Sequence, residues 1–402
     1  MSAADDGGSK AHILIVTPHD YNLPGAVTSR HLALARGLSE QGVATRFLVV
    51  GSVDIGTLRR DHIEYSWQNI GVANIGRRRI GPVRGLPHQV SPGLLAVLCV
   101  GRDPLVLRRG RQAAHRVGAP ALLELTEFPD VVVPHRRGRA LYLRMLDHEI
   151  VRMDGVVTIS SALCGWVKCR SNAMPVFELP MIVDMDRFPT DMNRSSQSWR
   201  SREALHLGYA GSLKPAKDGL DLLLRALASI PDGNETPRPR LTVWGDGPDR
   251  GCLEKLARDL GLAGQVSFAG MIPTERVPAA LTSADCMVLP RPSSRQALGG
   301  FPTKLGEYLA SARPVITTTT GDIPRKLFDG EAVLVPPDDV TALADAINWV
   351  VSNRARARAV GYAGRLAAER EFAADRAANK LLSAIAEVRR SGPAGRTRKG
   401  RH

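Results

Sequence analysis

Short runs of Val, Ile and Leu alternate with amphipathic stretches along most of the chain, and this alternation limits the fold more than any other feature. Residues 12–16 are typical of a strand, residues 29–41 carry apolar residues at helical spacing, and residues 45–50 resemble a second strand. Further strand-like runs follow at 121–125, 155–159 and 176–179. Such alternation predicts βαβ units, and therefore a parallel sheet with helices on both faces.

Residues 190–203 interrupt this pattern. The segment is rich in Ser, Arg and Asn and almost lacks aliphatic residues, as linkers do. A second alternating series follows, and a chain of 402 residues is long enough for two domains. We therefore expect two doubly wound α/β domains. The predicted parts are a disordered N-terminus at 1–10, an N-terminal domain at 11–195, a C-terminal domain at 196–375, a helix at 376–390 and a disordered basic tail at 391–402.

The formal net charge of +14 is concentrated in two segments. Residues 77–144 hold 13 Arg and four acidic residues, a balance of +9, and residues 389–402 hold six basic residues and no acidic one. These two segments sum to +15, so the remaining chain is at −1. A basic patch and a basic tail suit nucleic acid, an anionic membrane surface or a phosphorylated substrate. The basic segments lack interleaved aromatic residues, which argues against nucleic acid.

The sequence favours a cytoplasmic protein. Residues 1–10 are acidic where a signal peptide would be basic, and the apolar run that follows is too short for its core. The apolar run 94–100 is also far shorter than the ~20 residues that span a bilayer. Five cysteines without a CxxC pair are typical of reduced thiols. We expect any membrane contact to be peripheral, at the inner face of the cell membrane.

Residues 300–316, GFPTKLGEYLASARPVI, form the most informative segment. Pro302 suits the first turn of a helix, where free N–H groups and the helix dipole bind anions. Lys304 adds a full positive charge in the same turn. Glu307 lies three residues further along the same face, where its carboxylate can accept hydrogen bonds from a ribose diol. The segment predicts a nucleotide-binding helix; an amphipathic helix with a solvated Lys–Glu pair is the alternative.

Residues 207–223, LGYAGSLKPAKDGLDLL, predict a second anion site. A strand ends in the turn Gly211-Ser212, and Lys217 stands before Asp218, the predicted N-cap of the next helix. Two lysines, Lys217 and Lys304, would neutralise a diphosphate that gains charge as it leaves a sugar. For Lys217, the alternative is a solvated loop lysine.

With these motifs the chain resembles the family 4 glycosyltransferases of the two-domain GT-B fold. The family's Lys-Gly turn appears as GSLKPAKDG, and its Gly-x-Gly-Pro turn appears as LTVWGDGP, with Gly245. The segment VSFAG before Met271 and Ile272 corresponds to the part whose backbone grips the base. The family's second conserved glutamate corresponds to Glu307. The resemblance implies two Rossmann-like domains that face a central cleft, and sugar transfer with retention.

The chain departs from the family pattern at several positions. The family's first glutamate falls at Gly299, and GGFPTK is a variant seen in members that build bacterial polysaccharides and glycolipids. Ser212 stands where the family commonly has an arginine. In the first domain, Glu127 lies in LELTEFP, near the place of a family histidine, and is the expected acceptor-side or sugar-side carboxylate. The family's first glycine loop corresponds to Pro24-Gly25.

The sequence thus predicts a metal-independent glycosyltransferase without a cofactor, which moves a sugar from a UDP- or GDP-linked donor to a glycan, glycolipid or lipid-linked acceptor. The predicted catalytic residues are Glu127, Lys217 and Lys304. The predicted donor-binding residues are Gly25, Gly211, Ser212, Lys217, Gly245, Met271, Ile272, Gly299, Gly300, Phe301, Pro302, Thr303, Lys304 and Glu307. Two alternatives stay open: a GT-B nucleotide-sugar epimerase, which needs no acceptor, and a basic nucleic-acid-binding protein.

Overall fold

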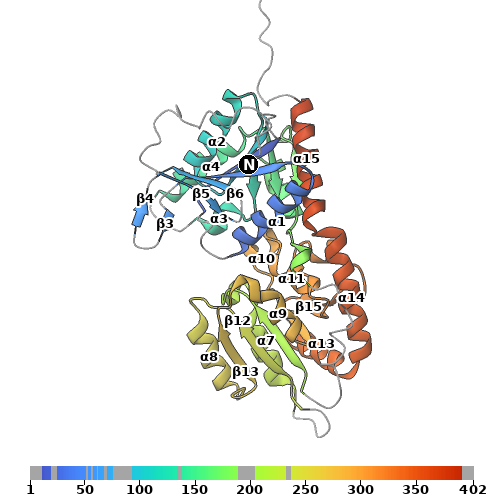
Figure 1. Ribbon diagram of the computed structural model, residues 1–402. Coiled ribbons are helices and arrows are strands. Elements are labelled where there is room, and N and C mark those ends of the chain that lie inside the picture. Colours follow the sequence, from blue (N-terminus) through green and yellow to red (C-terminus); the bar gives the residue numbers. More distant parts are fainter. Residues whose placement is uncertain are drawn as a thin grey trace, which may run out of the picture. The chain divides into compact units, whose positions relative to one another are not determined.

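The computed structural model describes residues 11–19, 25–50, 93–133, 138–188, 204–231 and 237–391, together with the backbone of four strands between 53 and 75. The chain divides into two compact units: unit 1 comprises residues 1–180 and 374–402, and unit 2 comprises residues 181–373 (Figure 1). Each unit is built on its own mostly parallel sheet, which confirms the predicted pair of doubly wound α/β domains.

Unit 1 contains an eight-stranded sheet in the order β10-β9-β8-β7-β1-β2-β6-β5. All neighbouring pairs are parallel except β5 and β6, which are antiparallel. Because β2 lies on one side of β1 and β7 on the other, the chain order reverses between β1 and β7. The strands are β1 His12–Thr17, β2 Ala44–Val50, β5 His62–Trp67, β6 Ile70–Ile75, β7 Leu94–Val100, β8 Ala121–Leu125, β9 Gly155–Thr158 and β10 Val176–Glu178, and a separate hairpin is formed by β3 Val53–Ile55 and β4 Leu58–Arg60.

The helices of unit 1 connect these parallel strands. Its longest connecting helix, α1, joins β1 to β2, and α2 joins β7 to β8. The strands read as almost unbroken apolar runs because both faces of a parallel sheet are covered; every residue of β1 and β8 is buried. The helices are α1 Ala26–Glu40, α2 Pro104–Arg116, α3 Pro129–Val132, α4 Arg139–Ile150, α5 Ser161–Lys168 and α15 Ala374–Ser391.

Unit 2 contains a six-stranded, fully parallel sheet in the order β13-β12-β11-β14-β15-β16. Its strands are β11 His206–Ala210, β12 Arg240–Trp244, β13 Val266–Gly270, β14 Cys286–Leu289, β15 Val315–Thr318 and β16 Val333–Val335. Its helices are η3 Met185–Arg187, α6 Pro215–Asp218, α7 Leu220–Ser229, α8 Arg250–Asp259, η5 Thr274–Arg276, α9 Val277–Ser283, α10 Arg295–Gly299, α11 Thr303–Ala310, α12 Ile323–Lys326, α13 Val340–Ser352 and α14 Arg354–Glu371. The order reverses between β11 and β14, so their carboxyl ends mark the edge where doubly wound sheets bind ligands.

The boundary between the units lies at Met181, whereas the sequence predicts it near residue 195. The segment after Met181 belongs to unit 2 because it packs on that unit's helices. The Gly306 N–H of α11 lies 2.9 Å from Met181 Sδ, and the Val183 N–H donates to the Phe372 carbonyl at 2.8 Å. The predicted linker, N-terminus and basic tail lie outside the described residues, apart from Ser391 at the end of α15.

The C-terminal helix α15 is part of unit 1 and not an appendage of the second domain. It lies along α1 (Figure 1) and comes so close that a Cβ on Gly37 would overlap the Ala374 carbonyl. Near its other end, the Arg389 guanidinium donates to the carbonyls of Leu94 and Leu95 at 2.9 and 3.1 Å. The chain therefore returns to its first domain to complete that domain's helical layer.

Among the described residues, no helix is both long enough and apolar enough to cross a membrane.

The contact between α1 and α15 gives a prediction for stability. Substituting Gly37→Ala should destabilise unit 1 by about 1–3 kcal/mol, because the added methyl group forces the two backbones apart. The control is Gly165→Ala in α5, where a Cβ would meet no atom within 4 Å. This substitution should raise the free energy of unfolding by about 0.5–1 kcal/mol, because alanine favours the helix more than glycine does. Urea unfolding of both variants measures the difference. If both substitutions stabilised the protein, or both destabilised it, the close packing of α1 on α15 would be contradicted.

Candidate functional site

In unit 2, Lys304 of α11 reaches the carboxyl end of β11. Its Nζ lies 2.8 Å from Tyr209 Oη and donates to the carboxylate of Asp218, which is 2% exposed. Tyr209 Oη lies 2.9 Å from the Ser212 carbonyl and 3.1 Å from Asp218 Oδ2. These contacts tie α11, β11 and α6 together and hold the Lys304 ammonium at the ligand-binding edge of the sheet.

Two glycine turns make room for this lysine. A Cβ on Gly211 would overlap the end of the Lys304 side chain, and a Cβ on Gly245, where φ is +135°, would overlap the Gly211 carbonyl. The Gly211 N–H donates to the Trp244 carbonyl at 2.8 Å, and the Gly245 N–H donates to the Gly270 carbonyl at 2.7 Å. A larger side chain at position 245 would push the two turns apart, and one at position 211 would displace the end of the Lys304 side chain. The packing around Lys304 therefore favours glycine at both positions.

The structure gives Asp218 a different role from the predicted N-cap. Gly219, with φ of +70°, precedes α7, and no side chain caps that helix. A Cβ on Gly219 would overlap the Pro290 carbonyl, so the chain passes close to the end of β14 at this point. The Asp218 carboxylate is thereby turned toward Lys304.

The charges around Lys304 act in opposite directions. Burial lowers the Lys304 pKa most strongly, the Asp218 carboxylate raises it, and the charges of Lys217 and Arg291 lower it. The structure thus brings the two predicted lysines, Lys217 and Lys304, into one electrostatic cluster and adds Arg291, which is 1% exposed. With one carboxylate and three cations, this cluster has a formal charge of +2.

Glu307, the predicted ribose ligand, is held by a residue that the sequence analysis missed. Arg187 Nη1 donates to Glu307 Oε1 at 3.1 Å, and Arg187 Nη2 donates to the Thr274 carbonyl at 2.7 Å. Burial raises the pKa of Glu307, and the Arg187 charge opposes this rise. Arg187 therefore links the carboxylate on α11 to the first residue of η5.

The remaining predicted donor residues lie around these elements. Met271, 66% exposed, and Ile272 follow β13 directly, and Ser212 is exposed beside Gly211. Gly299 ends α10, and Gly300 follows it. Pro302 precedes α11, so Thr303 and not Pro302 is the first helical residue.

Phe301 is a correction to the predicted site. Its ring is buried and packs against the ring of Phe372, with centroids 5.5 Å apart and planes tilted by 50°. The apolar core of unit 2 takes up this side chain, so it is a packing residue and not a side-chain contact for a ligand.

In unit 1, two predicted residues lie where the sequence placed them. Glu127 follows the carboxyl end of β8, and its Oε2 lies 3.6 Å from Arg102 Nη1 in a partly exposed ion pair. Gly25 precedes α1 in an extended conformation, and a Cβ there would meet no atom within 4 Å. Nothing in the described residues requires glycine at position 25.

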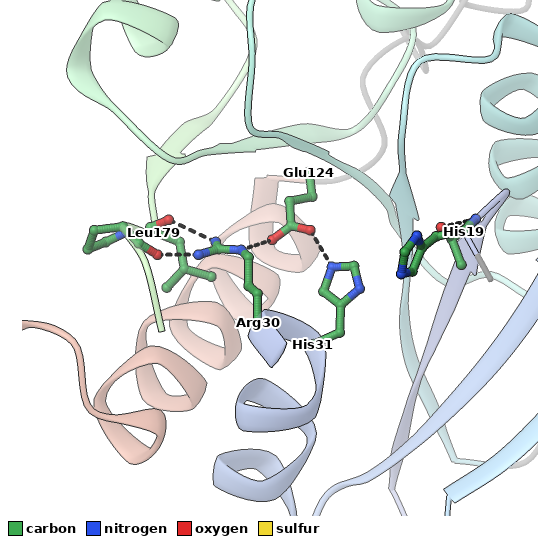
Figure 2. A network of polar contacts seen from close by, with 7 residues as sticks. His19, Arg30, His31, Glu124 and Leu179 are labelled. Atoms are coloured by element: carbon green, nitrogen blue, oxygen red, sulfur yellow. Dashed lines mark hydrogen bonds and ion pairs between the residues drawn. The ribbon is translucent and has the colours of Figure 1, made fainter. Parts of the chain in front are cut away.

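A buried ionic network in unit 1 was not predicted. Glu124 lies between two residues of α1: Arg30 Nε at 2.8 Å from Oε1 and His31 Nε2 at 2.6 Å from Oε2 (Figure 2). Arg30 also donates to the carbonyls of Pro180 and Leu179 at 2.5 and 2.9 Å. Because an ionised carboxylate only accepts hydrogen bonds, His31 Nε2 carries the proton. Burial alone would raise the Glu124 pKa, but Arg30 and His31 hold it well below its usual range.

Sequence reasoning missed Tyr209, Asp218 and Arg187 for different reasons. Tyr209 lies inside an apolar strand, and Asp218 was assigned to a helix cap. Arg187 lies in a segment interpreted as a domain crossover, 120 positions from its partner Glu307. A polar tyrosine one residue before the end of a central strand was the single available signal.

In the part of the chain that the structure describes, no group of three or more His, Cys, Asp or Glu side chains could hold a metal ion.

The Glu124 network gives a prediction with a defined pH dependence. Substituting Glu124→Gln leaves the Arg30 charge buried without its carboxylate and should cost about 3–5 kcal/mol at neutral pH. Because the folded-state pKa of Glu124 is depressed, its stabilisation is complete above about pH 5 and is lost progressively as the pH falls below the unfolded-state pKa. Unfolding curves from pH 3 to 7 measure the difference in the free energy of unfolding between the wild type and Glu124→Gln. We expect this difference to become smaller as the pH falls. Glu40→Gln removes the exposed pair with Arg36 and should cost less than about 0.5 kcal/mol; an equal loss in both variants would contradict the assignment.

The Lys304 cluster gives a second prediction. Substituting Asp218→Asn removes the carboxylate that raises the Lys304 pKa, so burial and the neighbouring cations should lower that pKa further. NMR titration of the lysine side chains, with Lys304 assigned by Lys304→Arg, measures the midpoint. The control Asp259→Asn removes a carboxylate beside the exposed Lys255 and should leave the Lys304 midpoint in place. If Asp218→Asn left the titration midpoint of Lys304 unchanged, the Asp218 carboxylate would not stabilise the charged form of Lys304.

Residues 204–353, which contain the Lys304 cluster, match the family model described as Glycosyl transferases group 1. A GDP-mannose-dependent alpha-(1-6)-phosphatidylinositol monomannoside mannosyltransferase of Mycolicibacterium smegmatis is 33% identical over 196 residues, 46% of this chain and 50% of that protein. The chain thus spans about half the length of this relative. A 2-deoxystreptamine glucosyltransferase of Streptomyces kanamyceticus is 25% identical over 384 residues, 88% of this chain and 96% of that protein.

Solved structures share the fold over nearly the whole chain. Sucrose-phosphate synthase from Thermosynechococcus elongatus superposes with a TM-score of 0.72 at 19% identity, covering 95% of this chain and 100% of that one. HepE of Anabaena, solved in complex with UDP-glucose, superposes with a TM-score of 0.67 at 18% identity, covering 94% of this chain and 99% of that one. The chain therefore has the two-domain GT-B fold, and its residues 204–353 match the family of group 1 glycosyl transferases.

Proposed function

We propose that this protein is a retaining, metal-independent glycosyltransferase that moves a sugar from a nucleotide-sugar donor to a glycan, glycolipid or lipid-linked acceptor. The observation that carries the proposal is the cation cluster at the carboxyl end of β11, with the Glu307 carboxylate three residues beyond Lys304 on the same helix. The family match of residues 204–353 and the relatives named for phosphatidylinositol monomannoside or deoxystreptamine support sugar transfer.

The cluster has the charge that the reaction requires. When the bond between the anomeric carbon and the diphosphate oxygen breaks, its electron pair leaves with the nucleoside diphosphate. Lys217, Lys304 and Arg291, offset by Asp218, supply a formal +2 where this negative charge develops. Preorganised charges in a partly buried site stabilise such a leaving group without reorganisation. The acceptor hydroxyl then bonds to the anomeric carbon, and its proton passes to the departing phosphate.

The other residues have positions suited to the rest of the donor. Glu307 would accept the ribose hydroxyls, and the backbone at Met271 and Ile272 would contact the base, for which UDP and GDP are the expected carriers. Glu127, at the carboxyl end of β8, is the proposed acceptor-side carboxylate. In this scheme the donor nucleotide is a substrate, and no cofactor takes part.

The same proposal includes a peripheral position at the inner face of the cell membrane. It is supported by relatives named for phosphatidylinositol substrates and by the excess of arginine in residues 77–144. A lipid-linked acceptor is confined to a bilayer, so an enzyme that uses one must work at the bilayer surface.

Thermal-shift measurements with UDP-, GDP-, TDP- and ADP-linked sugars test the proposal. A ligand at 100 times its Kd should stabilise the wild type by about 2.7 kcal/mol. Lys304→Ala and Glu307→Ala should each abolish this shift and donor turnover while leaving the circular dichroism spectrum unchanged. Lys255→Ala, an exposed lysine on α8, is the matched control and should behave as wild type.

Two outcomes would contradict the proposal. If Lys304→Ala and Glu307→Ala both kept full donor turnover, Lys304 and Glu307 would not be donor-binding residues. A product formed from donor alone, without acceptor, would favour a nucleotide-sugar epimerase.

A further inference from the structure

A groove of about 570 Å³ lies between α2 and α4 of unit 1, two helices that pack side by side (Figure 1). Its charged lining comes from Arg108, Arg111, Arg144, Arg152, His148 and Glu149. Glu149 already accepts a hydrogen bond from Arg111 at 2.9 Å. Four arginines and one glutamate give the lining a formal charge of +3 with histidine neutral.

The cations of this groove face solvent. Arg108, Arg144 and Arg152 are exposed, and so is His148. On α4, each of positions 141, 144, 145 and 148 lies three or four residues from another of them, so they form one continuous face of the helix. Arg152 follows two residues after the end of α4. The groove is therefore bordered by a basic strip and not by scattered surface charges.

Large apolar side chains lie on the same strip. Leu105 on α2 is 49% exposed, and Leu141 and Met145 on α4 are 65% and 45% exposed. Exposed apolar residues beside cations are the pattern of helices that lie in the interface of an anionic bilayer, where methyl groups enter the acyl boundary and arginines meet phosphates. A nucleic acid offers phosphates but no apolar partner for these three side chains, and no Phe, Tyr or Trp ring lines the groove for base stacking.

The groove also lies next to the proposed acceptor-side carboxylate. Helix α2 begins at Pro104, directly after the carboxyl end of β7, and Arg102 of that connection pairs with Glu127. Tyr142 of α4 donates to the Arg102 carbonyl at 2.8 Å, so the same connection is tied to both helices of the groove.

We propose that the α2–α4 groove is the membrane-docking surface of this protein and that it takes the phosphate headgroups of an anionic phospholipid bilayer. Arg108, Arg144 and Arg152 contact the phosphates, and Leu105, Leu141 and Met145 enter the interface. The inference rests on the proposed function, because a lipid-linked acceptor held there would present its head group to Glu127.

Co-sedimentation of the full chain with vesicles tests the docking surface. Vesicles of phosphatidylcholine are compared with vesicles of phosphatidylcholine and phosphatidylglycerol in equal amounts. The wild type should bind the anionic vesicles alone at moderate salt. Arg108→Gln combined with Arg144→Gln should weaken this binding about 30-fold, which is about fivefold per arginine lost near an anionic surface. Leu141→Ser combined with Met145→Ser should weaken it as well, with the salt dependence retained.

A matched control separates the groove from overall charge. Arg258→Gln combined with Arg356→Gln removes two exposed arginines from unit 2 and should leave vesicle binding unchanged. Equal losses in the two double-arginine variants would overturn the proposal, since they would show attraction of a basic protein without a specific surface. A 30-fold loss of affinity for duplex DNA in the groove variant would also overturn it, in favour of a nucleic-acid surface.

Donor binding distinguishes failure of this inference from failure of the proposed function. The groove variants should keep the wild-type thermal shift with the nucleoside diphosphate, which also reports that they are folded. Retained donor binding with unchanged vesicle binding overturns the docking surface alone.

Discussion

Parallel strand pairing is the constraint on which the site depends. Because β11 runs parallel to both β12 and β14, the turns that follow these three strands emerge at one edge of the sheet. Gly211 and Arg291 thus come close to Lys304 of α11, and Gly245 packs on Gly211, although these residues are far apart in the sequence. The hydrogen bonds from Gly211 to Trp244 and from Gly245 to Gly270 continue the ladder past the strand ends and fix how close these turns come.

The two units each contain a buried ionic network, and the two networks have different chemical capacities. In unit 1, both oxygens of Glu124 are occupied by α1, and Arg30 also binds two main-chain carbonyls. The donors and acceptors are matched within the fold, so the network joins α1, β8 and residues 179–180. In unit 2, the Asp218 carboxylate contacts Lys304, and the positive charges of Lys217 and Arg291 also act on that lysine, so this gathering of positive charge suits an anionic ligand. The buried charges around Glu124 therefore serve the structure of unit 1, whereas those around Lys304 form a candidate binding site in unit 2.

The fold gives the arginines of residues 77–144 different roles: some bond to other parts of unit 1, and others face solvent. Arg139 donates to the carbonyls of Asp130 and Val133 and so ties the start of α4 to α3 and the residue after it. Arg111 is bound to Glu149, whereas Arg108 and Arg144 remain on the exposed strip of the α2–α4 groove. Residues 77–79, 84, 136 and 137 lie outside the described residues. The net charge of the sequence could not distinguish arginines that hold loops from those that face solvent.

The sequence by itself determined the repeating α/β order and the two domains, because helical and strand periodicity and glycine turns are local properties of the chain. It also predicted the lysines and the glutamate of the candidate site. β8 begins and ends where the apolar run 121–125 predicts. Only the tertiary structure decided that Asp218 binds Lys304, that Arg187 binds Glu307, that Phe301 lies in the core and that α15 returns to unit 1. Each of these depends on a partner many positions away, and the pairing of distant side chains is set by strand order and helix packing, which no local pattern encodes.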